Sequence, residues 1–262
     1  MRRANGQGET APGEILRQFY ATLLERFGPQ GWWPARTRWE VICGAVLTQN
    51  TTWTNAARAI KNLRQAGVLA RKRMLELPLE ELETLMLPAG FYRQKARALH
   101  NIAQWIDQAH RGSLNVLFAQ PVELARAQLL ALKGIGPETA DAILLYAGRH
   151  PAFVADAYTR RILSRHDLIP ATADYDSAQG FLHQHLAPEQ SMFNEFHALL
   201  VETTKRFCHR SVAHCEECPL GSYLRRNLKL APRNSKVEIR NAAAGLEFDP
   251  GVSILAERRD AN

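Results

Sequence analysis

Residues 132–161 read LKGIGPETADAILLYAGRHPAFVADAYTRR, and they predict a tight glycine hairpin, a helix, and then an aspartate ahead of a second helix. Gly134 and Gly136 stand two positions apart, so the backbone can turn sharply and approach a ligand without a Cβ in the way. Ile135 between them can anchor the turn in a core, and Pro137 suits the first position of the following helix. Because the N–H groups at such a helix start lack intrahelical partners, the stretch predicts an anion-binding site.

A Gly-x-Gly pair alone also occurs in ordinary turns between packed helices, so the identification depends on the longer pattern. Leu-x-Gly-Ile-Gly-x-x-Thr-Ala, followed one helix later by Val154-Ala155-Asp156, resembles the helix-hairpin-helix DNA glycosylases of the endonuclease III type. The resemblance extends from about Trp32 to Leu220. It implies that Asp156 is the catalytic residue. It also implies that the hairpin grips the DNA backbone through Leu132, Gly134, Ile135, Gly136 and Thr139.

Hydrophobic residues recur at helical spacing along most of the chain, and no segment shows sustained polar–apolar alternation bounded by turns. The sequence therefore predicts an all-α fold. Helices are expected over residues 14–27, in two parts over 39–63, from about 78, from about 91, and over 122–132, 157–165 and 193–207, with a loop at 74–77.

The resemblance implies a two-lobed architecture with the active site in the cleft between the lobes. Residues 31–150 are expected to form a six-helix lobe that carries the hairpin. Residues 1–30 and 151–231 are expected to form a discontinuous helical lobe with the catalytic aspartate and a cysteine loop, and residues 232–262 a flexible tail.

The composition is that of a globular, basic protein. Of its 262 residues 46% are hydrophobic, and 33 Lys and Arg against 26 Asp and Glu give a formal net charge of +7 and a pI of about 9.5. A basic surface without further function is one interpretation, and a polyanionic partner such as double-stranded DNA is the other. No apolar run is long enough to span a membrane and no signal-peptide core follows Met1, so we expect a cytoplasmic protein without membrane contact. We also expect it to be a monomer.

Asp156 precedes a predicted helix, where an aspartate ordinarily serves as the N-cap. Capping and catalysis are compatible, because a helix N-terminus keeps a carboxylate ionised at neutral pH. An ionised carboxylate can stabilise the positive charge that develops on the sugar when an N-glycosidic bond breaks, or orient the attacking water.

Glu138 is where the sequence departs from endonuclease III, since the resemblance places a lysine here in the relatives that cut the DNA strand. A carboxylate cannot form the Schiff base of that lyase reaction. The segment Gly-x-Glu-Thr-Ala-Asp-Ala-Ile-Leu instead resembles the monofunctional 3-methyladenine DNA glycosylase III branch. We therefore expect Glu138 to lie beside the substrate as a first-turn helix residue, and we expect no AP lyase activity.

Residues 32–34 and 48–53 resemble the base-pocket segments of that branch. An enzyme that works on a base must flip it out of the stack and hold it against flat side chains. A desolvated indole attracts a cationic alkylated base by about 1–2 kcal/mol. Burial in the core is the alternative for these tryptophans. Gln49 is expected to fill the gap that the flipped base leaves, and the expected pocket residues are Trp32, Trp33, Pro34 and Trp53.

Residues 90–99 resemble the glycine-aromatic-tyrosine segment that opens a helix in the family. Phe91 is an apolar tip, and three basic residues, Arg93, Lys95 and Arg97, follow it closely. We interpret Phe91 as a DNA wedge backed by phosphate contacts. A solvated basic helix start is the alternative.

Cys208, Cys215 and Cys218 match the first three ligands of the family's [4Fe-4S] loop. The fourth ligand would stand at position 224, where this chain has Leu224. Three thiolates and a histidine at position 209 or 214 could still hold a cluster or a zinc ion. A degenerate loop without metal is the main alternative.

Together these features predict a monofunctional DNA glycosylase of base excision repair that hydrolyses the N-glycosidic bond of alkylated purines and leaves an abasic site. Two alternatives stay open. One is a mismatch or oxidised-pyrimidine glycosylase of the endonuclease III type, with or without AP lyase activity. The other is a non-catalytic protein that uses the hairpin only as a DNA clamp, and Asp156 argues against it because such a binder needs no carboxylate facing phosphates.

Overall fold

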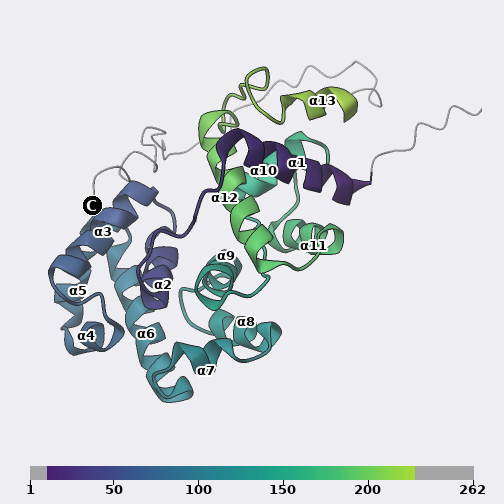
Figure 1. The fold of residues 1–262 in the computed structure, drawn as a ribbon. Coiled ribbons are helices and arrows are strands. Elements are labelled where there is room, and N and C mark those ends of the chain that lie inside the picture. The colour runs from purple at the N-terminus through teal and green to yellow at the C-terminus, as the bar shows by residue number, and fades with distance from the viewer. Residues whose placement is uncertain (1–10, 228–262) are drawn as a thin grey trace, which may run out of the picture.

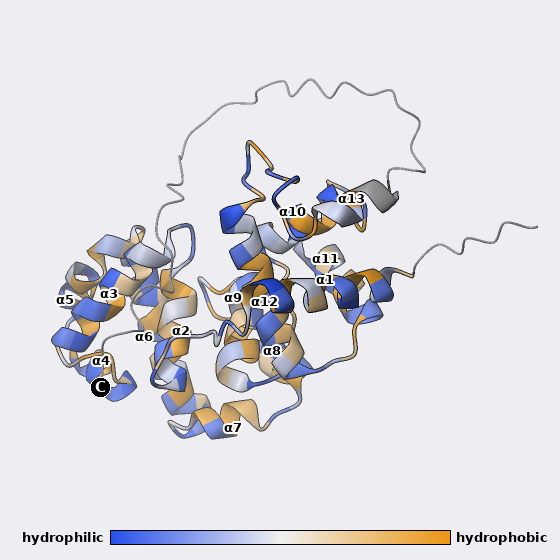
Figure 2. Ribbon diagram, turned by 45° about the horizontal axis from the view of Figure 1, so that its top comes forward, coloured by the Kyte–Doolittle hydropathy of each residue, from blue (hydrophilic) through white to orange (hydrophobic). Residues whose placement is uncertain are grey.

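The computed structural model describes residues 11–227 and consists of helices joined by loops (Figure 1). Within this range no strand forms, and an isolated bridge pairs Cys208 with Ala213. The prediction of an all-α fold is therefore confirmed. Figure 2 shows hydrophobic and hydrophilic residues mixed along most helices, as amphipathic packing requires. In the described range no helix has both the length and the apolar character of a membrane span.

The helices have the following bounds: α1 (Pro12–Phe27), α2 (Arg38–Leu47), α3 (Trp53–Gln65), α4 (Arg71–Glu76), α5 (Leu79–Leu85), η1 (Leu87–Ala89), α6 (Tyr92–His110), α7 (Leu114–Phe118), α8 (Val122–Leu130), α9 (Pro137–Ala142), η2 (Ile143–Gly148), α10 (Ala157–Arg165), α11 (Tyr175–His185), α12 (Gln190–Arg206) and α13 (Gly221–Asn227). η1 is a 3₁₀ turn, and η2 continues α9 as a π-helix. The tail expected at 232–262, and residues 1–10 and 228–231 of the expected second lobe, lie outside the described residues.

The loop expected at 74–77 is largely helical instead, because it belongs to α4. Arg71 at the start of α4 forms an ion pair with Asp107 of α6 and donates to the Gly112 carbonyl at 2.8 Å. Met74 is fully buried. These tertiary contacts stabilise a helix that is too short to be stable alone or to show hydrophobic periodicity.

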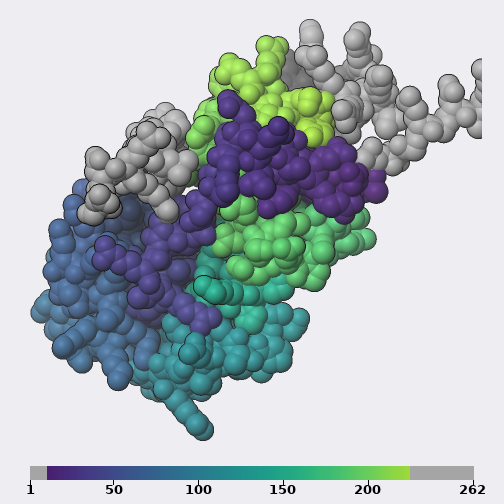
Figure 3. Space-filling model, in the orientation of Figure 1, coloured from purple at the N-terminus to yellow at the C-terminus, as the bar shows by residue number. Residues whose placement is uncertain are grey.

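The helices form two groups, and α1 belongs to the group that is distant from it in sequence. Helices α2 to α8 form one group, in which nearly all of α2 is buried. α1 packs instead against α11 and α12, and its buried Phe19 lies edge-on to His166 with ring centroids 4.8 Å apart. The chain after α1 then runs across the face of the molecule seen in Figure 3 to reach α2. The domain boundaries expected near residues 30 and 150 stay predictions.

The continuous stretch of α9 and η2 lies between the two groups. All 6 residues of η2 are buried, and η2 contacts both α2 and α12. α9 carries Asp141, which is fully buried. Its carboxylate accepts hydrogen bonds from Arg126 of α8 at 2.7 and 3.0 Å, and from Tyr175 and Gln179 of α11 at 2.8 Å each. One carboxylate therefore ties α8, α9 and α11 together.

Candidate active site

The predicted hairpin and helix start are present, and the hairpin packs against α6. Gly134 has a left-handed backbone (φ 92°), which a residue with a Cβ adopts only with strain. A Cβ at this position would also lie 3.1 Å from the Cβ of Ala98. Ile135 is buried, its N–H donates to the Leu132 carbonyl at 3.1 Å, and Gly136 is the N-cap of α9. Both glycines are exposed, while Ile135 anchors the turn in the core.

Gln49, in the joint between α2 and α3, is bound to this hairpin. Its Nε2 donates to the Gly134 carbonyl at 3.0 Å and to the Thr139 hydroxyl at 2.8 Å. Thr139 is buried, so its side chain faces Gln49 rather than solvent. The predicted roles of Gln49 and Thr139 toward DNA stay predictions.

Asp156 is the N-cap of α10, as predicted, and is only 8% exposed. Its Oδ1 accepts from the Thr159 N–H at 2.8 Å, and its Oδ2 lies 3.4 Å from Nε2 of His197 on α12. Burial raises the pKa of Asp156, but His197 and the hydrogen bonds from Thr159 outweigh burial, and the net pKa is lowered. The carboxylate is therefore ionised at neutral pH.

Two further ionisable side chains lie in the electrostatic field of Asp156. Glu138 reaches solvent, yet the protein that crowds its carboxylate raises its pKa, and repulsion by Asp156 raises it further. Lys205 of α12 is half-buried, and this burial lowers its pKa despite the opposing charges of Glu202 and Asp156. Lys205 belongs to no motif, and only the packing of α12 brings it to the site.

Three tryptophans form one aromatic cluster, here called the tryptophan cluster. The ring centroids of Trp32 and Trp33, and those of Trp32 and Trp53, lie 5.0 Å apart, and those of Trp33 and Trp53 lie 5.3 Å apart. All three side chains pack against the core but stay partly exposed, and Pro34 is exposed. A Cβ at Gly44 would lie 2.8 Å from the Trp33 ring. The Trp33 indole can therefore pack against α2 because residue 44 has no side chain. The cluster is thus an accessible aromatic surface.

A line of contacts leads from the tryptophan cluster to Asp156. Trp33 contacts Tyr146 of η2, with ring centroids 5.1 Å apart. The Tyr146 hydroxyl is hydrogen-bonded to Nδ1 of His197, and both side chains are buried. The other ring nitrogen of His197 faces Asp156. Neither Tyr146 nor His197 is part of a motif, and their only signal in the sequence is a polar group on an otherwise apolar helix face.

Phe91 is an exposed tip, as a wedge requires. Its side chain is 58% exposed, and its backbone at the start of α6 is left-handed (φ 43°). Leu87 in the neighbouring η1 is 51% exposed. Arg93 and Arg97 are also exposed, so both remain available to phosphates.

The expected phosphate contact of Lys95 is wrong, because Lys95 is buried. Its Nζ donates to the carbonyls of Leu47 at 2.9 Å and Ala89 at 2.7 Å, and burial lowers its pKa to about 8. The ammonium therefore satisfies carbonyl groups at the ends of α2 and η1. The position of Lys95 in a basic segment behind Phe91 predicted a surface residue, but Lys95 lies on the buried face of α6.

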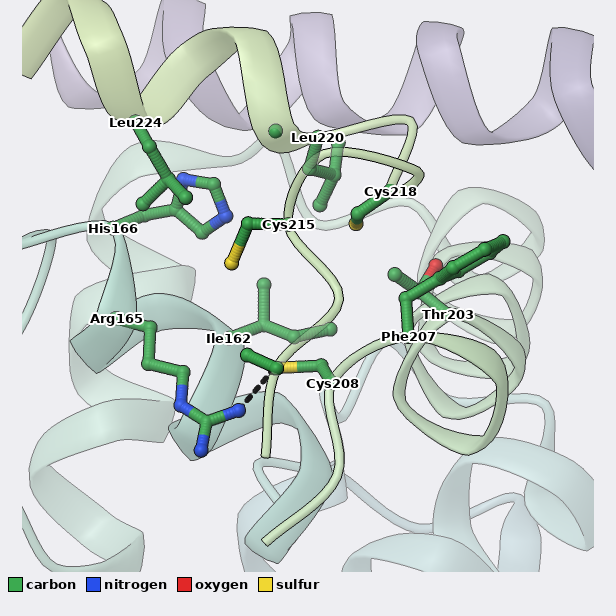
Figure 4. A pocket seen from close by; sticks show the side chains of 12 residues that line it. Ile162, Arg165, His166, Thr203, Phe207, Cys208, Cys215, Cys218, Leu220 and Leu224 are labelled. Atoms are coloured by element: carbon green, nitrogen blue, oxygen red, sulfur yellow. Dashed lines mark hydrogen bonds between the residues drawn. The ribbon is translucent and has the colours of Figure 1, made fainter. Parts of the chain in front are cut away.

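The three clustered cysteines line one pocket between α10, α12 and α13, as Figure 4 shows. Leu224 lines the same pocket, and so does His166, the residue that ends α10. Neither His209 nor His214 is among the residues that line it. The cysteines are Cys208, Cys215 and Cys218.

A [4Fe-4S] cluster with four protein thiolates does not fit this residue set, because Leu224 offers no ligating atom. In the part of the chain that the structure describes, no group of three or more His, Cys, Asp and Glu side chains is arranged to hold a metal ion. The Cys208 sulfur accepts a hydrogen bond from Arg165 at 3.0 Å, and burial raises the pKa of Cys218.

The chain is similar to known proteins over most of its length. A family model described as "HhH-GPD superfamily base excision DNA repair protein" matches residues 43–188, more than half of the chain. MJ1434 of Methanocaldococcus jannaschii, which bears a provisional name as a DNA repair glycosylase, is 41% identical over 211 residues, covering 80% of this chain and 96% of that protein.

Two solved structures are also similar. The 3-methyladenine DNA glycosylase MagIII of H. pylori, bound to 1,N6-ethenoadenine, is 28% identical with a TM-score of 0.65, covering 74% of this chain and 97% of that one. A trapped covalent intermediate of endonuclease III with DNA has a TM-score of 0.69 at 20% identity, covering 82% and 98%. The second likeness is one of fold.

Proposed function

The chain belongs to the HhH-GPD superfamily of base excision DNA repair proteins and is a DNA glycosylase, and from this premise we propose that it is monofunctional and excises alkylated purines. It acts as a monomer on double-stranded DNA, turns the damaged base out of the stack, hydrolyses its N-glycosidic bond and leaves an abasic site. The likeness to MagIII, whose structure holds a modified adenine, supports a purine substrate.

One observation carries the proposal: contacts through Tyr146 and His197 join the tryptophan cluster to Asp156. Glu138, which stands where lyase-type relatives have lysine, supports the monofunctional part of it. A base alkylated at N3 or N7 is cationic, so an indole attracts it. The same positive charge makes it a good leaving group, so little acid assistance is needed. Asp156 then stabilises the charge left on the sugar or orients the attacking water.

Trp53→Ala tests the substrate class. We expect excision of a cationic alkylpurine to fall about tenfold more than excision of a neutral damaged base, because a cation–π attraction of about 1–2 kcal/mol is lost for the cation alone. Single-turnover rates on duplexes with one 3-methyladenine or one hypoxanthine measure the difference. Trp53→Phe, which keeps a flat ring, is the matched control and should retain part of the preference. Equal losses on both duplexes would contradict an alkylpurine enzyme.

The position of Lys205 favours a second candidate, an enzyme that also cuts the strand. Lyase chemistry needs an unprotonated amine that reaches C1′ of the sugar. Lys205 lies in the field of Asp156, and burial lowers the pKa of its amine. The neighbouring carboxylates of Glu202 and Asp156 oppose that shift and favour the protonated form. We therefore rank this candidate second.

Borohydride reduction separates the two candidates. We expect an intact abasic strand and no covalent enzyme–DNA adduct, because Glu138 offers no amine and the charges of Glu202 and Asp156 favour the protonated form of Lys205. Gel electrophoresis of the reduced reaction measures the adduct. Glu138→Lys is the positive control and should gain one. An adduct in the natural chain that disappears in Lys205→Ala would establish the second candidate.

A further inference from the structure

His197 is a buried histidine whose two ring nitrogens face two different polar groups. It is 7% exposed on the apolar face of α12. Nδ1 is hydrogen-bonded to the Tyr146 hydroxyl, and Nε2 lies 3.4 Å from Oδ2 of Asp156. Among the described residues, Nε2 has no well-formed hydrogen bond, and the carboxylate of Asp156 is the acceptor that faces it.

The Tyr146 hydroxyl decides which ring nitrogen carries the proton. Burial, reinforced by the charge of Asp156, raises the pKa of Tyr146, so the hydroxyl keeps its proton and can donate it to Nδ1. A neutral imidazole has one donor and one acceptor nitrogen. With Nδ1 accepting from Tyr146, the proton of a neutral ring stands on Nε2, facing the carboxylate.

We propose that His197, held by Tyr146, is the positioning residue for the carboxylate of Asp156. The Thr159 N–H donates to Oδ1 at 2.8 Å, and Nε2 of His197 lies 3.4 Å from Oδ2 on the opposite element, α12. Each carboxylate oxygen therefore has a nitrogen facing it before DNA binds. The inference rests on the proposed function, in which Asp156 acts on the sugar.

The same contacts extend to the base-binding surface. Tyr146 lies against Trp33 on one side and His197 on the other, with ring centroids 5.1 and 5.9 Å away. A base on the tryptophan cluster and the carboxylate beneath the sugar are therefore placed by one chain of packed side chains. Orientation of this kind matters because a shift of about 1 Å in a reacting group can cost about 100-fold in rate.

Three variants test the proposal. We expect His197→Phe, which keeps the ring shape without nitrogens, to slow single-turnover base release about 100-fold. Its affinity for a duplex with a non-hydrolysable abasic analogue should stay within about threefold, since His197 is buried and phosphate contacts come from groups at the surface. His197→Gln places an amide N–H near the position of Nε2 and should recover most of the rate. Tyr146→Phe, which removes one hydroxyl, should show an intermediate loss.

The pH dependence separates positioning from a role in folding alone. Removing His197 removes a contact that lowers the pKa of Asp156, so that pKa rises. The acid limb of the pH–rate profile should therefore move to higher pH in His197→Phe and return in His197→Gln. The other titratable or charged groups coupled to Asp156 are unchanged in these variants: Tyr146 of η2, Glu138 of α9, Tyr158 and Arg161 of α10, and Lys205 of α12.

His110→Phe is the matched control, because His110 is equally buried but lies in α6 against Trp105. It should leave the excision rate and the acid limb unchanged. The proposal is overturned if His197→Phe excises at the natural rate, or if it loses rate without a shift of the acid limb. If His197→Phe fails to fold, a natural rate in Tyr146→Phe, which removes the hydroxyl that holds Nδ1, overturns the proposal equally. Excision by Asp156→Asn would instead overturn the proposed function, so the two failures are distinguishable.

Discussion

Asp156→Asn should lower the single-turnover rate of base release by about 1000-fold, because it removes the negative charge that stabilises the sugar cation. Asparagine is as good an N-cap as aspartate, so the hydrogen bond from Thr159 and the start of α10 should persist. DNA affinity should be unchanged or higher, since a like charge leaves a phosphate-binding cleft. The measurement is base release from an alkylated duplex under enzyme excess, with binding followed on an abasic analogue.

The same experiment tests whether the protein is a non-catalytic DNA clamp. If the natural chain releases no base from any alkylated, mismatched or oxidised duplex, the result supports the non-catalytic clamp. Asp156 then serves only as the N-cap of α10. If Asp156→Asn loses activity together with its helical circular dichroism, the loss reflects unfolding and the catalytic assignment fails. A folded, DNA-binding and inactive variant is the result that we expect.

Asp141→Ala should be the most destabilising single substitution among the polar residues of α9, by about 3–5 kcal/mol of unfolding free energy. The change leaves Arg126, Tyr175 and Gln179 without the acceptor that they share. Unpaired donors in a buried place cost their full desolvation energy. Urea unfolding followed by circular dichroism measures the loss.

Asp176→Ala is the matched control for that experiment. Asp176 also faces Arg126, at 3.6 Å, but its side chain is 71% exposed. A solvent-exposed ion pair contributes little, so the unfolding midpoint should barely move. Similar losses of unfolding free energy in the two variants would mean that burial of Asp141 does not determine how much it stabilises the fold.

Local patterns in the sequence predict the parts of the site that lie within one or two elements. The hairpin needs two glycines and one apolar anchor, and Gly134, Ile135 and Gly136 adopt the expected roles in the turn. Asp156 could be predicted because an N-cap is read from the residues beside it. The tryptophans were expected near one another through a resemblance, and the structure brings them into direct contact.

Residues whose role depends on contacts with elements distant in sequence could not be predicted from local patterns. His197 and Lys205 lie on a helix that periodicity describes only as amphipathic, and their neighbours come from η2, α9 and α10. Lys95 shows the converse error. A lysine in a basic segment ordinarily faces solvent, yet two orphan carbonyl groups inside the fold draw its ammonium inward.

The packing of α1 has a consequence for how the protein is made. α1 leaves the ribosome before the other helices that the structure describes, but its partners α11 and α12 are synthesised much later. Its apolar face, which includes Leu16, Phe19 and Leu23, has no native partner until then. Residues 31–150 can begin to collapse while translation continues, whereas α1 must wait, as nascent segments with distant partners do. A ribosome stalled before α12 would therefore hold a chain with an uncovered apolar helix, a natural target for chaperones.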